Sequence, residues 1–325
     1  MRDKSISGFI DLMNNYGAAG VPFLFIIDFD LNRPEIHKLD SVPEGIKFST
    51  PLIPGLFQQQ IYTKAHSLKR HPVSFNTYLR SFEKVRQNIN HGNSYLLNLT
   101  FPTILETELT IEEIFHISVA KYKLLYHNQF VVFSPEIFVR ISDGKIKSFP
   151  MKGTIDASVP DAKKNILNDE KEMAEHNTIV DLIRNDLSIF ADGVSVTRFR
   201  YIDEIKTKDG VLLQVSSEVT GMLGNGYENR LGNIIAAMLP AGSVTGAPKI
   251  ETIRIIKDSE TYERGWYTGV FGVFDGKSLD SGVMIRFIEN DSGRLIYKSG
   301  GGITSLSDPA KEYEELISKV YVPVG

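Results

Sequence analysis

Cysteine is missing from the 325-residue sequence. Without it the chain has no disulfide, no thiolate metal site and no cysteine nucleophile, so any bound metal needs oxygen or imidazole ligands. Oxygen ligands favour Mg²⁺.

The chain also lacks a large excess of positive or negative charge. Lysine and arginine total 36 against 40 for aspartate and glutamate, and the net charge of −4 offers no broad attraction for nucleic acid or acidic lipid. No segment approaches the ~20 apolar residues of a membrane span, and the start of the chain lacks the pattern of a signal peptide. We therefore expect a cytoplasmic protein with no nucleic-acid or membrane partner.

Hydrophobic residues make up 42% of the chain, enough for a large core, and their spacing predicts its elements. Residues 21–28 read as a buried strand, and residues 75–89 as an amphipathic helix that ends at His91-Gly92. Further strands are predicted at 130–133, 137–141 and 145–149, and near residues 194, 215, 270, 283 and 296. Further helices are predicted at 162–187, with one break, and at 231–238. Three more helices are predicted to start at Thr110, at Thr245 with Pro248 in the first turn, and at Asp308, the last of these running to about Lys319.

The grouping of these elements indicates the fold class. Strands come in adjacent groups, and helices lie between the groups. This order favours an α+β fold of mixed, largely antiparallel sheets with helices packed on the outside. No linker divides the chain, so a single domain over residues 1–325 is expected.

Two pairs of glutamates share a spacing of three residues. Glu172 and Glu175 lie on one predicted helix, and Glu312 and Glu315 lie on another, with Lys319 one turn further on. Like charges at this spacing cost a helix about 0.2–0.5 kcal/mol, which suggests a cation held between the two helices. Two solvated surface faces are the alternative.

Two glycine-bearing segments suit an anion. Gly300 to Gly302 follow a predicted strand, where bare backbone N–H groups can approach a carboxylate or phosphate, although a flexible turn has the same composition. The second segment, GSVTGAPK, contains Thr245 and Gly246 and leads into a predicted helix, but it lacks the spacing of a Walker A loop.

Lys152 and Glu136 are candidate reactive groups. Lys152 lies beyond a strand with Gly153 after it; a nucleophilic role requires a lowered pKa, whereas a solvated lysine in a turn is inert. Glu136 begins a strand and suits a general acid if it is partly buried.

Six segments, taken in order, resemble the chorismate-utilising enzymes, a family that includes anthranilate and aminodeoxychorismate synthase components I and the isochorismate and salicylate synthases. The resemblance covers about Ser74 to Val320. It implies a catalytic core over 74–322 after a shortened N-terminal part, 1–73. The segments are GNSYLLNLT, FSPEIFVRI, FPMKGT, EMAEHNTIVDLIRNDLS, PAGSVTGAPK and the stretch from YTGVFGVF through MIRF and SGGGITSLSDPAKEYEELISKV.

The resemblance implies a role for each candidate residue. Glu175 and Glu315 would bind Mg²⁺ directly, and Glu172 and Glu312 would hold its water shell. Glu136 would protonate the departing 4-hydroxyl of chorismate. The positions implied to bind the other substrate carboxylate and the pyruvyl arm are Tyr267, Arg286, Gly300, Gly302 and Lys319. Thr245 and the backbone around Gly246 would line the ring.

Lys152 separates branches of the family, because anthranilate synthases usually carry alanine there and aminodeoxychorismate synthases carry lysine. The resemblance thus implies an aminodeoxychorismate synthase component I, in which the Lys152 amine attacks ring carbon 2, ammonia adds at carbon 4 and the lysine departs. The implied partners are a glutamine amidotransferase subunit that supplies ammonia and a separate downstream lyase that forms 4-aminobenzoate for folate.

Two positions depart from the family pattern. Leu213 stands where many relatives have a histidine of the anthranilate reaction, and Leu96 replaces a glutamine of aminating members or a lysine of the water-using ones. An anthranilate synthase component I and a non-catalytic chorismate-binding subunit remain the alternatives.

Overall fold

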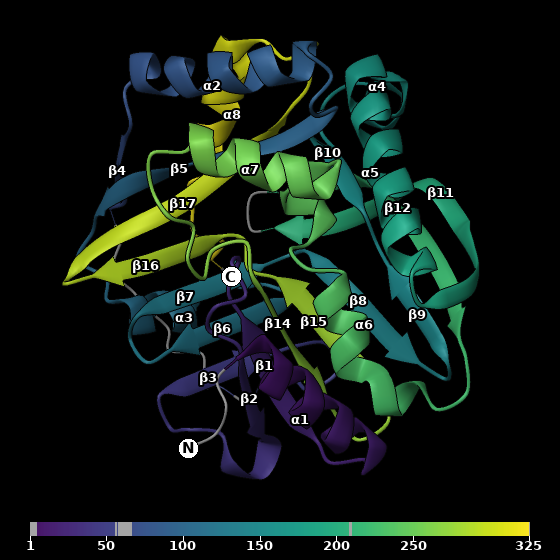
Figure 1. Cartoon of the computed structure of the whole chain (residues 1–325). Helices are drawn as coiled ribbons and strands as arrows, with labels where there is room; N and C mark the ends of the chain where they lie inside the picture. The colour runs from purple at the N-terminus through teal and green to yellow at the C-terminus, as the bar shows by residue number, and fades with distance from the viewer. Residues whose placement is uncertain (1–4, 56, 58–66, 208–209, 325) are drawn as a thin grey trace.

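The strands pair into two antiparallel sheets. A computed structural model describes residues 5–55, 57, 67–207 and 210–324 of the chain (Figure 1). Within these ranges, every pairing between named strands is antiparallel. The predicted α+β class with largely antiparallel sheets is therefore confirmed.

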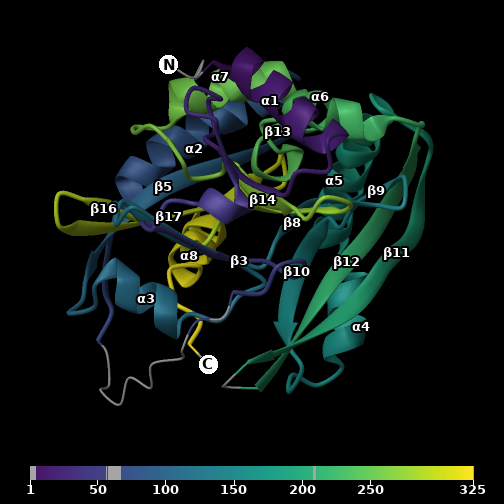
Figure 2. The same cartoon turned by 90° about the horizontal axis from the view of Figure 1, so that it is seen from below.

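The first sheet combines strands from the N-terminal part, the middle and the last quarter of the chain. Its strands, in spatial order, are β10 (Met151–Asp156), β12 (Gly210–Leu223), β9 (Lys145–Ser148), β8 (Ile137–Ser142), β15 (Leu279–Val283), β14 (Val270–Phe274), β1 (Phe23–Ile27) and β2 (Glu35–Lys38), and β11 (Ala191–Thr207) pairs with β12. Figure 2 shows β11 and β12 as a long two-stranded ribbon at one side of the molecule.

The second sheet carries the glycine run. Its strands are β13 (Gly246–Ala247), β5 (Leu96–Glu106), β17 (Arg294–Ile303), β16 (Phe287–Asp291), β7 (Phe130–Ser134), β6 (Tyr122–Tyr126) and β3 (Ile46–Ser49), and β4 (Lys69–Pro72) pairs with β5. Leu24 and Ile26 of β1 pack with Phe130 and Phe287 of this sheet, whereas Phe23 and Phe25 point to the opposite face. Alternation along β1 thus places the two sheets face to face.

Helices cover the outer faces of both sheets (Figure 1). Helices α2 (Phe75–Asn90), α7 (Lys249–Ser259) and α8 (Pro309–Ser318) pack on the second sheet, and α1 (Ile6–Ala18), α5 (Glu170–Ser188) and α6 (Leu231–Ala237) on the first. The remaining α-helices are α3 (Ile111–Ile117) and α4 (Ala162–Asn168), and the short 3₁₀ turns are η1 (Leu39–Ser41), η2 (Tyr227–Arg230) and η3 (Gly242–Val244).

Several local predictions are confirmed. Helix α2 ends at His91, followed by Gly92 with a φ of +79°. Thr110 and Glu113 form the predicted capping box of α3. The predicted break in the long helix falls at Asp169, between α4 and α5, where the Asp169 side chain accepts a hydrogen bond from the backbone of Glu172.

The predicted helix start at Thr245 is wrong. Gly246 and Ala247 form the short strand β13, which pairs with Leu97 and Leu96 of β5, and α7 begins only at Lys249 after Pro248. The Thr245 hydroxyl donates to the carbonyl oxygen of Ala241 at 2.9 Å instead of capping a helix. Pairing with β5 satisfies the backbone hydrogen-bonding groups of Gly246 and Ala247, so the helix begins only after this short strand.

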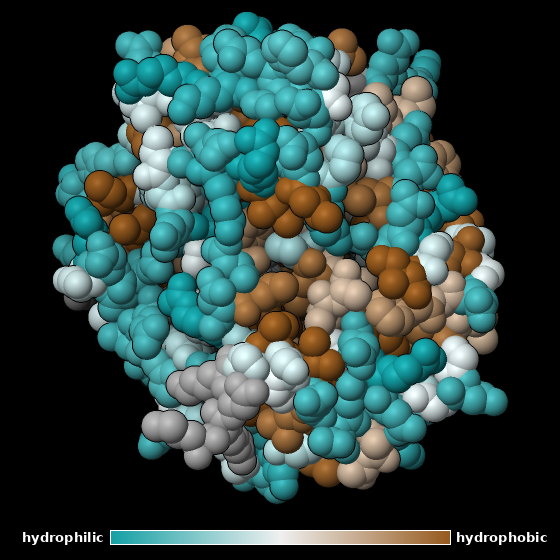
Figure 3. Space-filling view, in the orientation of Figure 1, coloured by the Kyte–Doolittle hydropathy of each residue, from teal (hydrophilic) through white to brown (hydrophobic). Residues whose placement is uncertain are grey.

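Three large hydrophobic residues are strongly exposed. Ile250, Leu306 and Tyr95 are 88%, 73% and 67% exposed. The backbone N–H of Tyr95 donates to the carbonyl of Ala247 at 2.9 Å. On the face shown in Figure 3, hydrophobic residues gather near the middle and hydrophilic ones surround them. No helix in the described part of the chain is both long and apolar enough to span a bilayer.

Candidate active site

The glycine run of β17 lies between the two glutamate-bearing helices. A Cβ atom added to Gly301 would lie 3.6 Å from Glu315 and 3.7 Å from Glu312, both on α8. A Cβ on Gly302 would lie 3.5 Å from Glu175 on α5. Glu312 and Glu315 of one pair and Glu175 of the other therefore face adjacent residues of one strand, where the absence of side chains leaves space. The glycines remain paired with β5 and do not form a turn.

Two lysines form ion pairs with Glu175 and Glu315 in this structure. Lys152 Nζ lies 2.5 Å from Glu175 Oε2, and Lys319 Nζ lies 2.7 Å from Glu315 Oε1. Lys319 also donates to the carbonyl oxygen of Gly300 at 2.9 Å. Glu175 is 3% exposed, so the Lys152–Glu175 pair is an inward-facing contact rather than a surface ion pair.

The pKa of Lys152 differs from the expected direction. Burial lowers the pKa of the amine, but the Glu175 carboxylate, with smaller contributions from Glu172 and Glu315, outweighs burial and raises the pKa above its ordinary value. The lowered pKa that a nucleophile requires is therefore not present while Glu175 pairs with Lys152. For Lys319, burial outweighs Glu315 and lowers the pKa.

Glu136 lies immediately before β8 and is partly buried. Its carboxylate accepts a short hydrogen bond from the Ser243 hydroxyl. Burial raises the pKa of Glu136, and the Ser243 bond and the positive charges of Lys152, Lys319 and Arg286 oppose that rise. A carboxyl with a raised pKa keeps its proton to higher pH, as a general acid requires.

Arg286 and Tyr267 lie together beside these charges. Burial raises the pKa of the Tyr267 hydroxyl, which also senses Arg286. The Arg286 guanidinium lies 5.0 Å from the centre of the Tyr321 ring. A half-buried cation beside phenol groups suits a substrate carboxylate.

Thr245, Gly246 and Leu96 form another wall. Gly246 lies so close to β5 that an added Cβ would stand 1.8 Å from the carbonyl oxygen of Leu96, so only glycine fits there. A Cβ on Gly302 would lie 3.1 Å from the Leu96 side chain and 3.0 Å from Lys152 Nζ. The leucine that replaces the usual polar residue thus borders the amine. Leu213 instead lines an open cavity with Ala162 and Lys163.

The four glutamates fit Mg²⁺ by residue type and by the space around them. Carboxylate oxygens are the ligands this ion prefers, and the cradle at Gly301 and Gly302 is one that a single Cβ would partly fill. Within the described ranges, no three acidic or histidine side chains stand at metal-binding distances, and Glu175 and Glu315 each pair with a lysine.

Sequence reasoning missed two polar groups of this region. Ser243 lies in the GSVTGAPK segment, and a serine six residues before helix α7 gave no signal of its contact with Glu136, 107 residues away. Arg264 is 2% exposed and paired with Glu260, and a charged residue in a loop is usually assigned to the surface.

The chain belongs to the chorismate binding enzyme family, whose model matches residues 43–324. The resemblance seen in the sequence is thereby confirmed.

Three similar proteins carry more specific names than the family. An uncharacterized PabA-like protein of Pasteurella multocida is 48% identical over 99% of this chain and 100% of its own length. Aminodeoxychorismate synthase component 1 of Bacillus subtilis is 29% identical over 77% of this chain and 55% of its own. Anthranilate synthase component 1 of Pseudomonas aeruginosa is 35% identical over 57% of this chain and 38% of its own.

The fold is that of a solved family structure. The menaquinone-specific isochorismate synthase of Escherichia coli superposes with a TM-score of 0.72 over 98% of this chain and 82% of its own, at 14% identity. At this identity the likeness shows the shared fold alone.

Proposed function

We propose that the chain is component I of an aminodeoxychorismate synthase, which replaces the 4-hydroxyl of chorismate with an amino group. The position of Lys152 carries the proposal: its amine lies among the glutamates, 2.5 Å from Glu175 and beside Gly302. The similarity to aminodeoxychorismate synthase component 1 of Bacillus subtilis supports it.

The proposed chemistry divides one substitution into two steps. The Lys152 amine attacks ring carbon 2, both double bonds of the conjugated ring diene shift toward carbon 4, and the 4-hydroxyl leaves as water with a proton from Glu136. Ammonia then adds at carbon 4, both ring double bonds return to their original positions, and carbon 2 releases the Lys152 amine. One water is lost and one ammonia gained overall, which gives 4-amino-4-deoxychorismate.

The remaining residues bind and orient the substrate. Glu175 and Glu315, with Glu172 and Glu312 behind them, would hold Mg²⁺, which supplies positive charge for one chorismate carboxylate. Arg286, Tyr267, Lys319, Gly300 and Gly302 would bind the other carboxylate and the pyruvyl arm, and Thr245 and Gly246 would line the ring. Engagement of Glu175 by another cation would remove the contact that raises the pKa of Lys152.

Ammonia would come from a separate glutamine amidotransferase subunit. The chain has no cysteine and so lacks the nucleophile of a cysteine glutaminase. A downstream lyase would convert the product to 4-aminobenzoate for folate.

An anthranilate synthase component I is the second candidate, because the relative in Pseudomonas aeruginosa is 35% identical in the matched region. Lys152 and Leu213 argue against it. A non-catalytic subunit is the third, and Leu96 beside Lys152 is the feature that favours it.

Dependence on ammonium tests the aminating class. We expect the purified chain to consume chorismate with Mg²⁺ and an ammonium salt, and to leave it intact with Mg²⁺ alone. Consumption without ammonium would place the chain in the water-using branch.

Substituting Ser243 tests the role of Glu136. Ser243→Ala removes a hydrogen bond that favours the charged carboxylate, so the pKa of Glu136 rises further. A general acid then keeps its proton to higher pH, and we expect the alkaline fall of the pH–rate profile to move upward. Ser188→Ala, at an exposed position of α5, should leave the profile unchanged. An unmoved alkaline limb in Ser243→Ala would count against Glu136 as the acid.

A further inference from the structure

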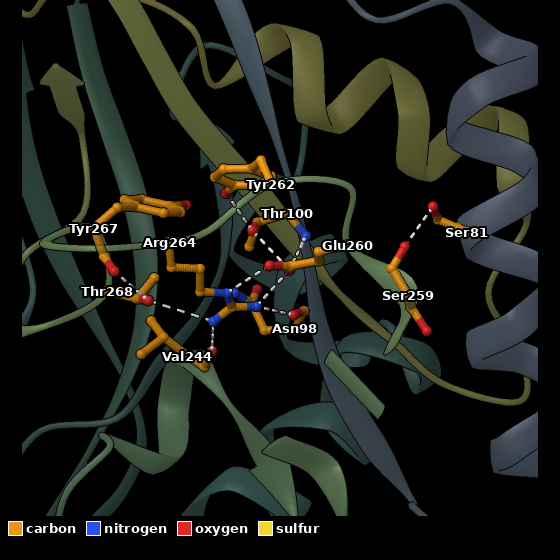
Figure 4. Close-up of polar contacts among 10 residues, drawn as sticks. All are labelled: Ser81, Asn98, Thr100, Val244, Ser259, Glu260, Tyr262, Arg264, Tyr267 and Thr268. Atoms are coloured by element: carbon orange, nitrogen blue, oxygen red, sulfur yellow. Dashed lines mark hydrogen bonds and ion pairs between the residues drawn. The ribbon is translucent and has the colours of Figure 1, made fainter. Parts of the chain in front are cut away.

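We propose that Arg264, held by Glu260, is a positioning residue that fixes the walls of the chorismate site, an inference that rests on the proposed function. The pair lies just outside the predicted binding residues (Figure 4). Arg264 Nε and Nη2 donate to the two Glu260 oxygens at 2.9 and 2.7 Å, and both side chains are 2% exposed. Neither group is open to a ligand.

The other donors of Arg264 reach three separate segments. Nη1 donates to the carbonyl of Val244 at 2.8 Å and to the Thr268 hydroxyl at 3.4 Å, and Nη2 donates to the carbonyl of Asn98 at 2.6 Å. Figure 4 shows these groups converging on the guanidinium.

Each segment carries a predicted binding residue. Val244 precedes Thr245, and Asn98 pairs with Gly302 across the sheet. The Thr268 hydroxyl donates to the carbonyl of Tyr267 at 2.6 Å.

Glu260 adds a second contact to β5, the strand that carries Asn98. Its Oε1 accepts from the backbone N–H and the hydroxyl of Thr100 at 2.9 and 2.7 Å. Thr100 pairs with Gly300. One buried ion pair therefore connects the main chains that carry Thr245, Tyr267, Gly300 and Gly302.

Arginine is required here because its planar fork donates in several fixed directions. Lysine would keep the charge and the pairing with Glu260, but its single ammonium group does not reproduce that fork. The segments of Asn98 and Thr245 are also joined without Arg264, because the Asn98 N–H donates to the carbonyl of Thr245 at 2.8 Å. Loss of the fork is therefore expected to loosen the site without unfolding the chain.

The test compares Arg264→Lys with Arg254→Lys. Arg254 is an exposed residue of α7 that pairs with Glu251 and Asp258 and serves as the matched control. For each variant we would measure kcat and KM for chorismate, equilibrium binding of chorismate, the Mg²⁺ titration midpoint, and amide hydrogen exchange over 242–247 and 264–268.

We expect Arg264→Lys to raise the KM and the dissociation constant for chorismate about tenfold or more, with a smaller fall in kcat, because small displacements of positioning groups have large effects. Exchange over the two segments should accelerate, and the Mg²⁺ midpoint should stay, since the carboxylate that pairs with Arg264 is that of Glu260. Arg254→Lys should match wild type. Thr100→Val, which removes one bond to Glu260, should shift the same quantities in the same direction by less.

Unchanged chorismate affinity and unchanged exchange in folded Arg264→Lys would overturn the inference. So would a loss of affinity for chorismate and Mg²⁺ together, which indicates general destabilisation. Should wild type bind chorismate without aminating it, the proposed function fails while the binding and exchange measurements still decide the role of Arg264.

Discussion

Replacing Lys152 with alanine is expected to lower the rate of chorismate amination by about two orders of magnitude or more, because the variant lacks the amine that attacks ring carbon 2. Chorismate binding in the presence of Mg²⁺ should change little, since the glutamates and Arg286 remain. Steady-state amination and equilibrium binding, measured on the same preparation, separate these two effects.

Lys145→Ala is the control for this substitution. Lys145 is an exposed lysine of β9 in the same sheet, and its removal should leave amination unchanged. Amination by Lys152→Ala at the wild-type rate would eliminate the covalent role. A loss of binding as large as the loss of rate would instead assign Lys152 to substrate binding.

Replacing Glu315 with alanine is expected to weaken the dependence on Mg²⁺ severely, with the Mg²⁺ midpoint raised at least about 100-fold, since even outer-shell groups cost 10–100-fold in metal affinity. The carboxylate lies over Gly301 and opposite the Glu175 of the other helix. Removal leaves Lys319 without its carboxylate partner at 2.7 Å, so this amine stays available to the chorismate carboxylate that the metal does not bind.

Glu314→Ala provides the comparison, because Glu314 is the neighbouring exposed residue of α8. Its Mg²⁺ titration should match that of wild type. A Glu315→Ala titration indistinguishable from both would remove Glu315 from the metal site.

Local chemistry made much of the fold predictable. The spacing of apolar residues in 75–89 and the glycine at 92 specify helix α2 and its end, because both signals act within a few residues. The glutamate spacing correctly placed each pair on one helix. It did not place the two helices on either side of Gly301 and Gly302, since that arrangement depends on how α5 and α8 pack around β17.

Long-range pairing explains what the sequence did not reveal. The segment at Gly246 has the residues of a helix start, but its partner Leu97 on β5 makes it a strand. The pKa of Lys152 depends on Glu175, a residue of another element. Arg264 reaches Asn98 across 166 residues of sequence. Contacts at such separations leave no local pattern.

Product identity tests the central claim most directly. The purified chain would be incubated with chorismate, Mg²⁺ and an ammonium salt at mildly alkaline pH, and the products identified by mass spectrometry with and without aminodeoxychorismate lyase. We predict 4-amino-4-deoxychorismate, converted to 4-aminobenzoate only when the lyase is added. Anthranilate, isochorismate or salicylate as the product, or no turnover even with an amidotransferase partner, would contradict the account.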